Sequence, residues 1–288
     1  MQYVVMDLEW NNTYARKTSA FINEIIEIGA VKLDSSFNQV DTFTCIIRSQ
    51  IGHKLRGNVK KLTNLTNEDI SSGLPFTKAF SLFRKWIGND DTVIITWGDG
   101  DIRVLIENYS YLNGITAIPF LKNYCDLQKC FQKVTKGNPA LQPGLTAAAE
   151  QLNIDPEKYN HHRGLDDSLL TADVLRSIYE KNIFMSECHI CNDEFYDRLL
   201  FKAKVIKSLD SPLVDKKKLE HRCDSCGQLC KRLTEWKFSS QYFKAQFWCS
   251  DCDVTYNVKV RFKRKYDGVD FKKVVTTINA NDDDDDDE

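Results

Sequence analysis

The chain has 288 residues, of which 42% are hydrophobic and 28% charged, and its formal net charge at pH 7 is −2. This length is enough for one sizeable hydrophobic core and a smaller second module. No apolar stretch approaches the roughly 20 residues that a membrane-spanning helix needs, and we expect no signal or transit peptide because a strand-like run already begins at Tyr3. The ten cysteines then indicate reduced thiols and bound metal rather than disulfides, which favours a cytoplasmic location.

The near-zero net charge conceals two segments of opposite sign. Residues 192–280 carry 19 Lys and Arg against 12 Asp and Glu, a net charge of +7, whereas Asp282–Glu288 is wholly acidic and contributes −7. A basic module suits a polyanionic ligand. We expect the acidic tail to be disordered and to act either as a solubility element or as a competitor of nucleic acid for the basic surface.

The first predicted element is a strand over residues 2–8, an apolar run that ends at Asp7 and Glu9. Side chains alternate between the two faces of a strand, so these two carboxylates share one face. Adjacent carboxylates repel each other unless a cation neutralises them, and Mg²⁺ and Mn²⁺ prefer oxygen ligands of this kind. The pattern therefore predicts a metal site at the end of this strand.

The next elements are predicted to be two strands, a loop and a helix. Alternating apolar residues favour a hairpin of strands over 24–33 and 38–47. The glycine-containing segment 51–66 is expected to be a connecting loop, and a helix is expected near 78–87.

A buried strand over 91–97 leads through a glycine-rich turn into a helix over 101–109. Asp101 precedes Val104 by three residues and therefore lies on the inward stripe of this helix. Asp99 is more economically explained as an N-cap or turn residue.

A short strand near 121–125 is followed by predicted helices around 126–134, 144–152 and 166–181. Three strands followed by strand–helix units predict an α/β fold with a mixed sheet flanked by helices and a site at the strand ends.

The segment HHRGLDD contains two histidine–aspartate pairs of equal spacing, His161 with Asp166 and His162 with Asp167. Helical phase separates them. The face of Asp167 continues through core-type positions, namely Leu170, Thr171, Val174 and Ile178. The face of Asp166 continues through Asp173 and Glu180, so we assign the site to His162 and Asp167 and a solvated position to Asp166.

Taken together, Asp7-x-Glu9, Asp101 and the segment from His162 to Asp167 resemble the DEDDh branch of the DnaQ-like 3′→5′ exonucleases, which have an RNase H-like fold. The surrounding sequence is most similar to the subgroup that trims histone messenger ends and small RNAs, and to its KapD-like relatives. The resemblance covers roughly residues 1–182, and all its motifs occur in the family's order.

The resemblance implies a two-metal phosphodiester hydrolase that uses Mg²⁺ or Mn²⁺. It implies that Asp7 bridges both ions, that Glu9 and Asp167 complete the shell of one, that Asp101 holds the other, and that His162 is the general base. The implied substrates are the 3′ ends of single-stranded RNA or DNA, with RNA favoured and nucleoside 5′-monophosphates released. The alternative is a nucleic-acid-binding or adaptor protein with a weak or inactive nuclease domain.

Two Cys-x-x-Cys pairs, Cys223 with Cys226 and Cys249 with Cys252, are separated by 22 residues. Four thiolates at this spacing fit one tetrahedral Zn²⁺ with no open position, so the predicted site is structural, and four unligated buried cysteines are the alternative. Strands are expected over Lys231–Phe238, Tyr242–Trp248 and Val254–Phe262, the last with one apolar and one basic face. This region resembles a zinc ribbon.

The basic face of the predicted ribbon has two possible roles. Its cations and nearby aromatic residues either hold a single strand of nucleic acid or keep a small domain soluble; they are Lys259, Arg261, Lys263, Arg264, Lys265, Tyr242, Phe243 and Trp248.

We therefore expect an exonuclease domain over 1–185, a partly helical linker over 186–217, a β-rich zinc ribbon over 218–276 and an acidic tail over 277–288. The linker is expected to contain a helix over 192–209. Its Cys188 and Cys191 either join His221 or Cys230 in a second zinc site or form an isolated Cys-x-x-Cys pair.

Overall fold

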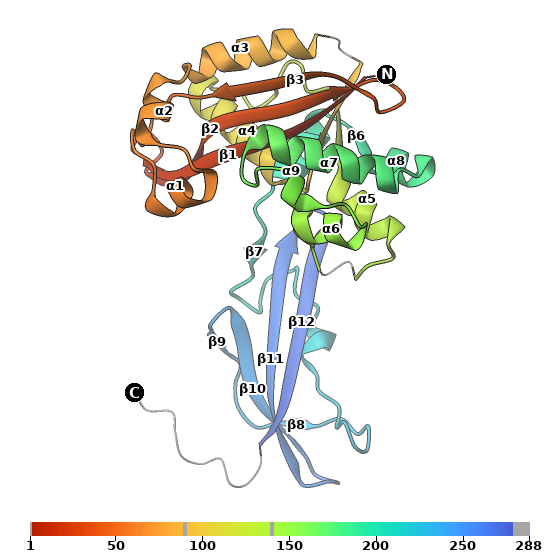
Figure 1. Ribbon diagram of the computed structural model, residues 1–288. Helices are drawn as coiled ribbons and strands as arrows, with labels where there is room; N and C mark the ends of the chain where they lie inside the picture. The colour runs from red at the N-terminus through yellow and green to blue at the C-terminus, as the bar shows by residue number, and fades with distance from the viewer. Residues whose placement is uncertain (1, 89–90, 139–140, 279–288) are drawn as a thin grey trace. The chain divides into compact units, whose positions relative to one another are not determined.

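The structure, a computed structural model, describes residues 2–88, 91–138 and 141–278. The acidic run Asp282–Glu288, predicted to be disordered, lies outside the described residues. The chain divides into two compact units, an N-terminal unit over Met1–Leu199 and a C-terminal unit over Leu200–Glu288 (Figure 1).

The N-terminal unit contains a six-stranded mixed sheet with the strand order β3-β2-β1-β4-β5-β6. Its strands are β1 (Gln2–Ala15), β2 (Ala20–Leu33), β3 (Gln39–Ile46), β4 (Thr92–Thr96), β5 (Asn123–Asp126) and β6 (Cys188–Ile190). Strand β1 is antiparallel to β2 and parallel to β4, β5 continues parallel to β4, and β3 and β6 are antiparallel edge strands. Because parallel strands are usually buried on both faces, we expect helices on both sides of the central strands.

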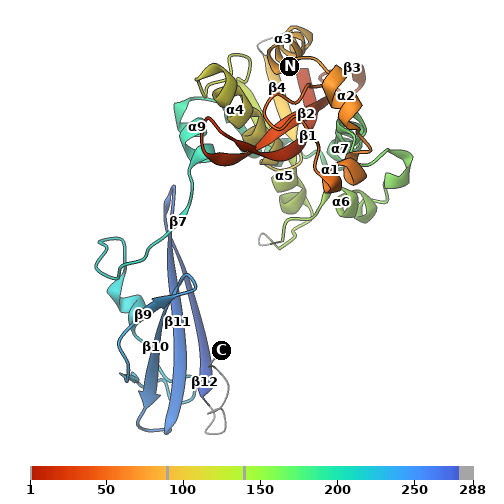
Figure 2. The same cartoon turned by 90° about the vertical axis from the view of Figure 1, so that its left-hand side faces the viewer.

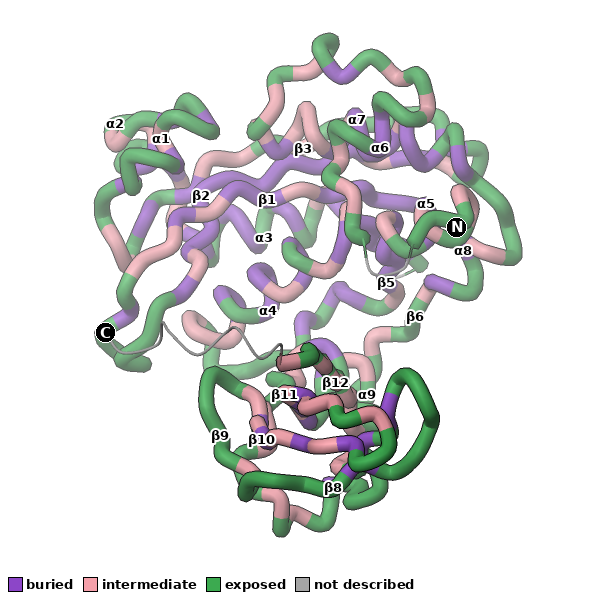
Figure 3. Tube along the Cα trace, turned by 90° about the horizontal axis from the view of Figure 1, so that it is seen from below, coloured by how far each residue is buried: buried purple, intermediate pink, exposed green. Residues whose placement is uncertain are grey.

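Helices lie on both sides of this sheet. They are α1 (Gly57–Thr63), α2 (Asn67–Ser72), α3 (Phe76–Ile87), α4 (Gly100–Asn113), α5 (Leu127–Val134), α6 (Leu145–Gln151), α7 (Gly164–Ile178), α8 (Lys181–Glu187) and α9 (Asp193–Leu200), with a 3₁₀ turn at Pro156–Lys158. Figure 3 shows β1 and β2 between α6 and α7 on one side and α3 and α4 on the other. The predicted mixed sheet flanked by helices is confirmed.

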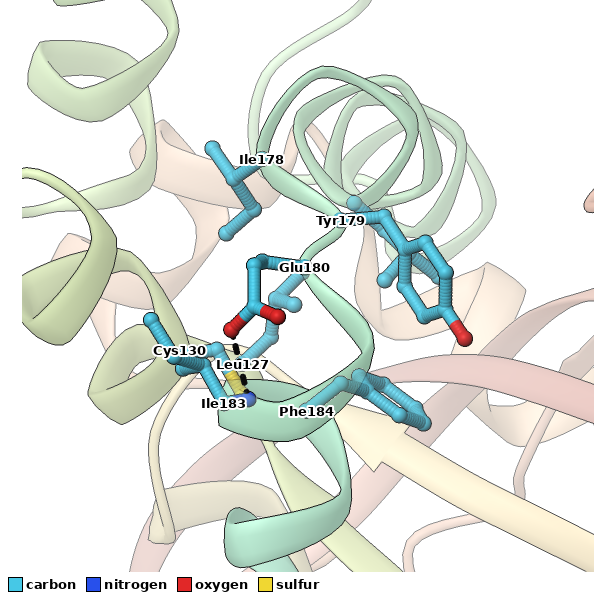
Figure 4. Close-up of a pocket in the computed structure, with 8 residues that line it drawn as sticks. Leu127, Cys130, Ile178, Tyr179, Glu180, Ile183 and Phe184 are labelled. Atoms are coloured by element: carbon cyan, nitrogen blue, oxygen red, sulfur yellow. Dashed lines mark hydrogen bonds between the residues drawn. The ribbon is translucent and has the colours of Figure 1, made fainter.

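On the α7 side of the sheet, the core is formed by alternate residues of β1 and by one face of α7. Tyr3 and Val5 of β1 pack with Leu170 and Val174 of α7 in one buried cluster. Figure 4 shows the adjoining junction of α5, α7 and α8, where the carboxylate of Glu180 caps α8 and accepts a hydrogen bond from the Ile183 amide at 2.8 Å. This packing fixes α7, which begins within the HHRGLDD segment, against the sheet.

Three predictions about elements of the N-terminal unit need correction. The segment 51–66, expected to be a loop, contains α1, and α2 begins after it with a capping box between Thr66 and Asp69. The first strand continues past residue 8 to Ala15, because β2 pairs along its whole length. The helix expected over 192–209 ends at Leu200.

The C-terminal unit is an antiparallel sheet with the order β12-β11-β10-β8, in which β7 also pairs with β11 and β9 with β10 (Figure 2). Its elements are β7 (Lys204–Val205), a 3₁₀ turn (Lys216–Leu219), β8 (Lys231–Arg232), β9 (Lys237–Ser239), β10 (Tyr242–Cys249), β11 (Val254–Lys265) and β12 (Gly268–Ile278). The strand predicted over Lys231–Phe238 is two short strands, and β12 was not predicted.

One face of this sheet forms the core of the C-terminal unit. Alternate residues of β10 and β11 are buried there, namely Phe243, Ala245, Phe247, Tyr256, Val258, Val260 and Phe262. Ile206, Leu209, Val214 and Leu219 from the preceding segment pack against them. The β-rich unit with its four-cysteine cluster fits the predicted zinc ribbon.

Within the described residues, no helix combines the length and the apolar character needed to cross a membrane.

Candidate active site

The acidic residues of β1 lie just beyond the part of the strand that pairs with β4. Pairing with β4 covers Gln2–Val5, and Asp7 and Glu9 follow on the face turned toward α7. Asp101 is buried in the first turn of α4, where its Oδ1 accepts a hydrogen bond from the Leu8 amide at 3.0 Å. This bond holds the Asp101 carboxylate against β1 at Leu8, the residue between the two acids of the strand.

A close contact between two glycines brings α7 to the same place. A methyl group at Gly29 would lie 1.9 Å from the carbonyl carbon of Gly164, so neither strand nor helix has room for a side chain here. The Ser168 hydroxyl donates to the Gly29 carbonyl oxygen at 3.1 Å. Because Gly29 is paired with Asp7 in the sheet, this contact places Asp167 beside the β1 acids.

His162 adjoins Asp167 through an unusual backbone conformation. Its φ of 63° lies in the left-handed region, and its amide donates to Asp167 Oδ2 at 3.0 Å. Ligand atoms of Glu9, His162 and Asp167 all lie within 4.8 Å of one another. His161 also approaches Asp167, with its Nδ1 at 3.8 Å from Asp167 Oδ1. Of the two histidines, however, only His162 belongs to the group with Glu9 and Asp167.

Burial and mutual repulsion raise the pKa values of these acids. Burial, and then the carboxylates of Asp101 and Asp167, raise the pKa of Asp7 well above its ordinary value. Burial is also the main cause that raises the pKa of Glu9 to about 8 and that of Asp101 to about 7. The pKa of Asp167 is raised by burial, although the amide of His162 opposes that shift. The site thus favours either protons or cations on its carboxylates.

Bound divalent cations fit this set of donors. Four carboxylates converge from three elements, and hard divalent ions such as Mg²⁺ and Mn²⁺ take oxygen ligands of this kind. The structure brings together all five residues singled out in the sequence, Asp7, Glu9, Asp101, His162 and Asp167.

Sequence reasoning missed a fifth acid at this site, which forms an ion pair. Glu27 of β2 pairs directly opposite Glu9, is 1% exposed, and accepts two hydrogen bonds from the Arg163 guanidinium, at 3.1 and 2.9 Å. The sequence contains a signal for this ion pair. Glu27 is a charged residue within an apolar run, on the same face as Gly29, and Arg163 lies within the HHRGLDD segment. Burial and the neighbouring carboxylates, Glu27 among them, raise the pKa of Glu9, whereas the Arg163 guanidinium lowers it.

The four cysteines of the C-terminal unit form a second cluster. The sulfurs of Cys223, Cys226, Cys249 and Cys252 lie within 4.8 Å of one another, and those of Cys226 and Cys249 are 3.5 Å apart. Four sulfurs at tetrahedral positions around Zn²⁺ are about 3.8 Å apart for Zn–S bonds of about 2.3 Å. The thiols therefore fit a closed Zn²⁺ site.

Cys188 is half-buried and packs against the core of the N-terminal unit, beside the buried Cys125 and Cys130. Cys191 follows at the end of β6, where its sulfur lies 3.9 Å from the His189 carbonyl oxygen. Among the described residues, neither cysteine belongs to a group of three metal-binding side chains.

Comparison with known proteins identifies the class to which this fold and acidic site belong, the exonucleases. A family model described as exonuclease matches residues 4–175. The chain belongs to this exonuclease family, and it is a hydrolytic 3′–5′ exonuclease.

Two relatives illustrate the range of the family. The probable 3′–5′ exonuclease KapD of Bacillus subtilis (strain 168) is 29% identical over 168 residues, which cover 58% of this chain and 78% of that protein. The ERI1 exoribonuclease 2 of Homo sapiens is 26% identical over 194 residues, which cover 59% of this chain but only 27% of the human protein.

Solved structures share the fold of the N-terminal unit. The nuclease domain of 3′hExo, a DEDDh family member bound to rAMP, has a TM-score of 0.54 and 22% identity, covering 66% of this chain and 96% of that one. A 3′-exonuclease described with 3′-end specific recognition of a histone mRNA stem-loop has a TM-score of 0.52 and 23% identity, covering 61% of this chain and 62% of that one.

Proposed function

We propose that this chain removes nucleoside 5′-monophosphates stepwise from the 3′ ends of single-stranded nucleic acid, with RNA preferred to DNA. The observation that carries the proposal is the convergence of the β1, α4 and α7 carboxylates beside the His162 imidazole. RNA is favoured because the human relative is named an exoribonuclease and a structural neighbour recognises a histone mRNA.

Four residues would hold two Mg²⁺ or Mn²⁺ ions, namely Asp7, Glu9, Asp101 and Asp167. When bound, the ions would stabilise the negative charge that develops on the attacking and leaving oxygens of the phosphodiester. The raised pKa values of Asp7 and Glu9 support this assignment. Burial and neighbouring carboxylates disfavour the charged forms of these acids, and bound cations would offset both effects.

His162 would act as the general base that takes a proton from the attacking water. Imidazole suits this task because it exchanges protons near neutral pH. The hydrogen bond from the backbone amide of His162 to the Asp167 carboxylate keeps the imidazole beside the acids. His162 is exposed, so solvent can reach its ring. In the C-terminal unit, Cys223, Cys226, Cys249 and Cys252 would hold one structural Zn²⁺.

The test uses 5′-labelled RNA and DNA strands of matched sequence with Mg²⁺ or Mn²⁺. We expect a ladder of 3′-shortened products, release of nucleoside 5′-monophosphates on chromatography, and faster loss of RNA. Asp7→Asn should abolish shortening, whereas Asp166→Asn, an isosteric change at the neighbouring acid of α7, should retain it.

Equal rates on RNA and DNA would remove the RNA preference alone. Release of 3′-monophosphates, or equal loss of activity in the two variants, would overturn the proposed chemistry.

A further inference from the structure

The outward face of the C-terminal sheet carries cations that the exonuclease site does not use. Because side chains alternate along a strand, the face opposite the buried core is formed by the intervening residues. Seven of them are basic and come from five adjacent strands; they are Lys231, Lys237, Lys244, Lys259, Arg261, Lys263 and Lys272. We call these seven residues the basic face.

Five of the seven cations of the basic face lie directly opposite another of them. Lys244 of β10 pairs with Lys237 of β9 on one side and with Lys259 of β11 on the other, and Arg261 pairs with Lys272 of β12. Like charges at opposite positions destabilise a sheet. Among the described residues, none of the seven forms an ion pair with an acid. Asp270 lies opposite Lys263 in the sheet, but its carboxylate forms an ion pair with Lys265 at 3.9 Å. A bound polyanion would remove this repulsion.

Two aromatic rings share the same face. Tyr242 and Trp248 alternate with the buried residues of β10, so their rings lie on the side of Lys244. The guanidinium carbon of Arg261 lies 5.3 Å from the centroid of the Tyr242 ring, and its Nε is buried without a hydrogen-bond partner in the described part of the chain. An arginine over an aromatic ring, between cations, provides both stacking and phosphate-binding groups.

We propose that the basic face is a second nucleic-acid-binding surface, which holds a single strand through phosphate contacts from its cations and base stacking on Tyr242 and Trp248. Charge complementarity identifies a polyanion, and the aromatic residues identify one that carries unpaired bases. The inference rests on the proposed function only in taking this strand to be the substrate of the exonuclease.

The test measures the dissociation constants of a fluorescent 20-nucleotide RNA and its DNA counterpart by anisotropy, using the full chain with Asp7→Asn to prevent degradation. Lys244→Glu with Lys259→Glu should weaken binding by about tenfold or more and lower the slope of log Kd against log salt by about 1.4, since two phosphate contacts are lost. Tyr242→Ala should weaken binding by about tenfold through lost stacking.

The matched control reverses two exposed lysines of the segment that covers the opposite face, Lys216→Glu with Lys217→Glu. It changes the net charge equally and should alter Kd by less than about twofold. Equal weakening by both pairs would show attraction by net charge alone and overturn the proposal, as would no weakening by the Lys244 and Lys259 pair. Lys244→Gln with Lys259→Gln, with unchanged zinc content and circular dichroism, separates lost contacts from misfolding.

The two proposals fail separately. If the unsubstituted chain shortens 3′ ends while the Lys244 and Lys259 reversal leaves Kd unchanged, the basic face is refuted and the exonuclease proposal stands. If the strand binds and depends on the basic face but no metal supports shortening, the exonuclease proposal fails and the binding surface stands.

Discussion

At the scale of single residues, the active site is a set of side chains that oppose folding. Asp7, Glu9, Asp101 and Asp167 each have a raised pKa, chiefly because burial disfavours their charged forms, and their neighbours add repulsion. Glu27, which is buried beside them, forms an ion pair with Arg163 at 2.9 Å. The metal-free protein should therefore be less stable than a protein of this size with a neutral site.

The first prediction concerns the stability of the metal-free protein as a function of pH. A carboxyl whose pKa is raised in the folded state favours folding when protonated, so its stabilising contribution is present at low pH and is lost as the pH rises toward the folded-state pKa. For Glu9 this window runs from its ordinary pKa of 4.5 to about 8. The melting temperature of metal-free protein should fall between about pH 5 and pH 8, and Mg²⁺ should restore it at pH 8.

Asp7→Asn provides the control, because it removes the charge that the other acids oppose. It should raise the metal-free stability at pH 8 by about 1–2 kcal/mol and reduce the gain from Mg²⁺. A lower melting temperature of Asp7→Asn under metal-free conditions would contradict the electrostatic account.

The second prediction separates the two neighbouring histidines. His162→Ala should lower kcat by about 10²–10⁴-fold, the usual contribution of a general base, while His161→Ala should lower it by less than about tenfold. Both variants should keep the melting temperature of the unsubstituted chain within a few degrees. Single-turnover rates on a 5′-labelled strand measure the difference, and equal losses would show that the assignment by helical phase is wrong.

At the scale of elements, the position of the active site depends on the contact between β2 and α7. Gly29 and Gly164 allow the backbones to touch, and α7 carries Asp167 one turn further on. A side chain at this contact must push the helix away from the sheet, because backbone atoms cannot rotate aside.

The third prediction tests that contact. Gly29→Ala should destabilise the N-terminal unit by about 3 kcal/mol or more and abolish exonuclease activity, since a methyl group there would overlap Gly164. Gly57→Ala is the matched control, because nothing lies within 4 Å of a methyl group at Gly57 and alanine favours the first turn of α1. Urea unfolding measures both, and equal stability of the two variants would refute the packing argument.

The elements that could be predicted from sequence are those with a local signal. Apolar alternation or helical periodicity marks most of the sheet and the longer helices, and the phase of α7 distinguishes Asp167 from Asp166. The second half of β1 has no such signal, since Asn11 and Asn12 are polar and form strand only because β2 pairs with them. Likewise, the chain after Leu200 leaves its helical path where β7 pairs with the end of β11.

At the scale of the whole molecule, the two units carry different chemistry on separate cores. The cluster around Tyr3 and Leu170 contains residues of the N-terminal unit only, and the cluster around Phe247 and Tyr256 contains residues of the C-terminal unit only. The two cores differ in composition. The N-terminal unit has a large apolar interior, whereas the C-terminal unit contains a four-cysteine cluster. Loss of zinc should therefore act on one unit alone.

The fourth prediction is that the C-terminal unit needs one Zn²⁺ per chain to fold. Cys226→Ser should remove the bound zinc and eliminate amide-exchange protection in β10 and β11, while protection in β1 and β4 stays unchanged. Cys45→Ser, at a half-buried thiol of the N-terminal unit, is the control and should retain the metal. Elemental analysis that finds no zinc in metal-replete protein would contradict the prediction.

The pairing of β1 with β4 also has a kinetic consequence. Val5 lies beside Ile95, and Gly29 meets Gly164, so the N-terminal unit closes only through contacts between distant parts of the polypeptide. The β11–β12 hairpin instead pairs Lys265 with Gly268 across a two-residue turn. Because distant contacts slow the search for the native state, the ribbon should acquire its structure quickly once synthesised, and assembly of the acidic centre should be the slow step in maturation of the enzyme.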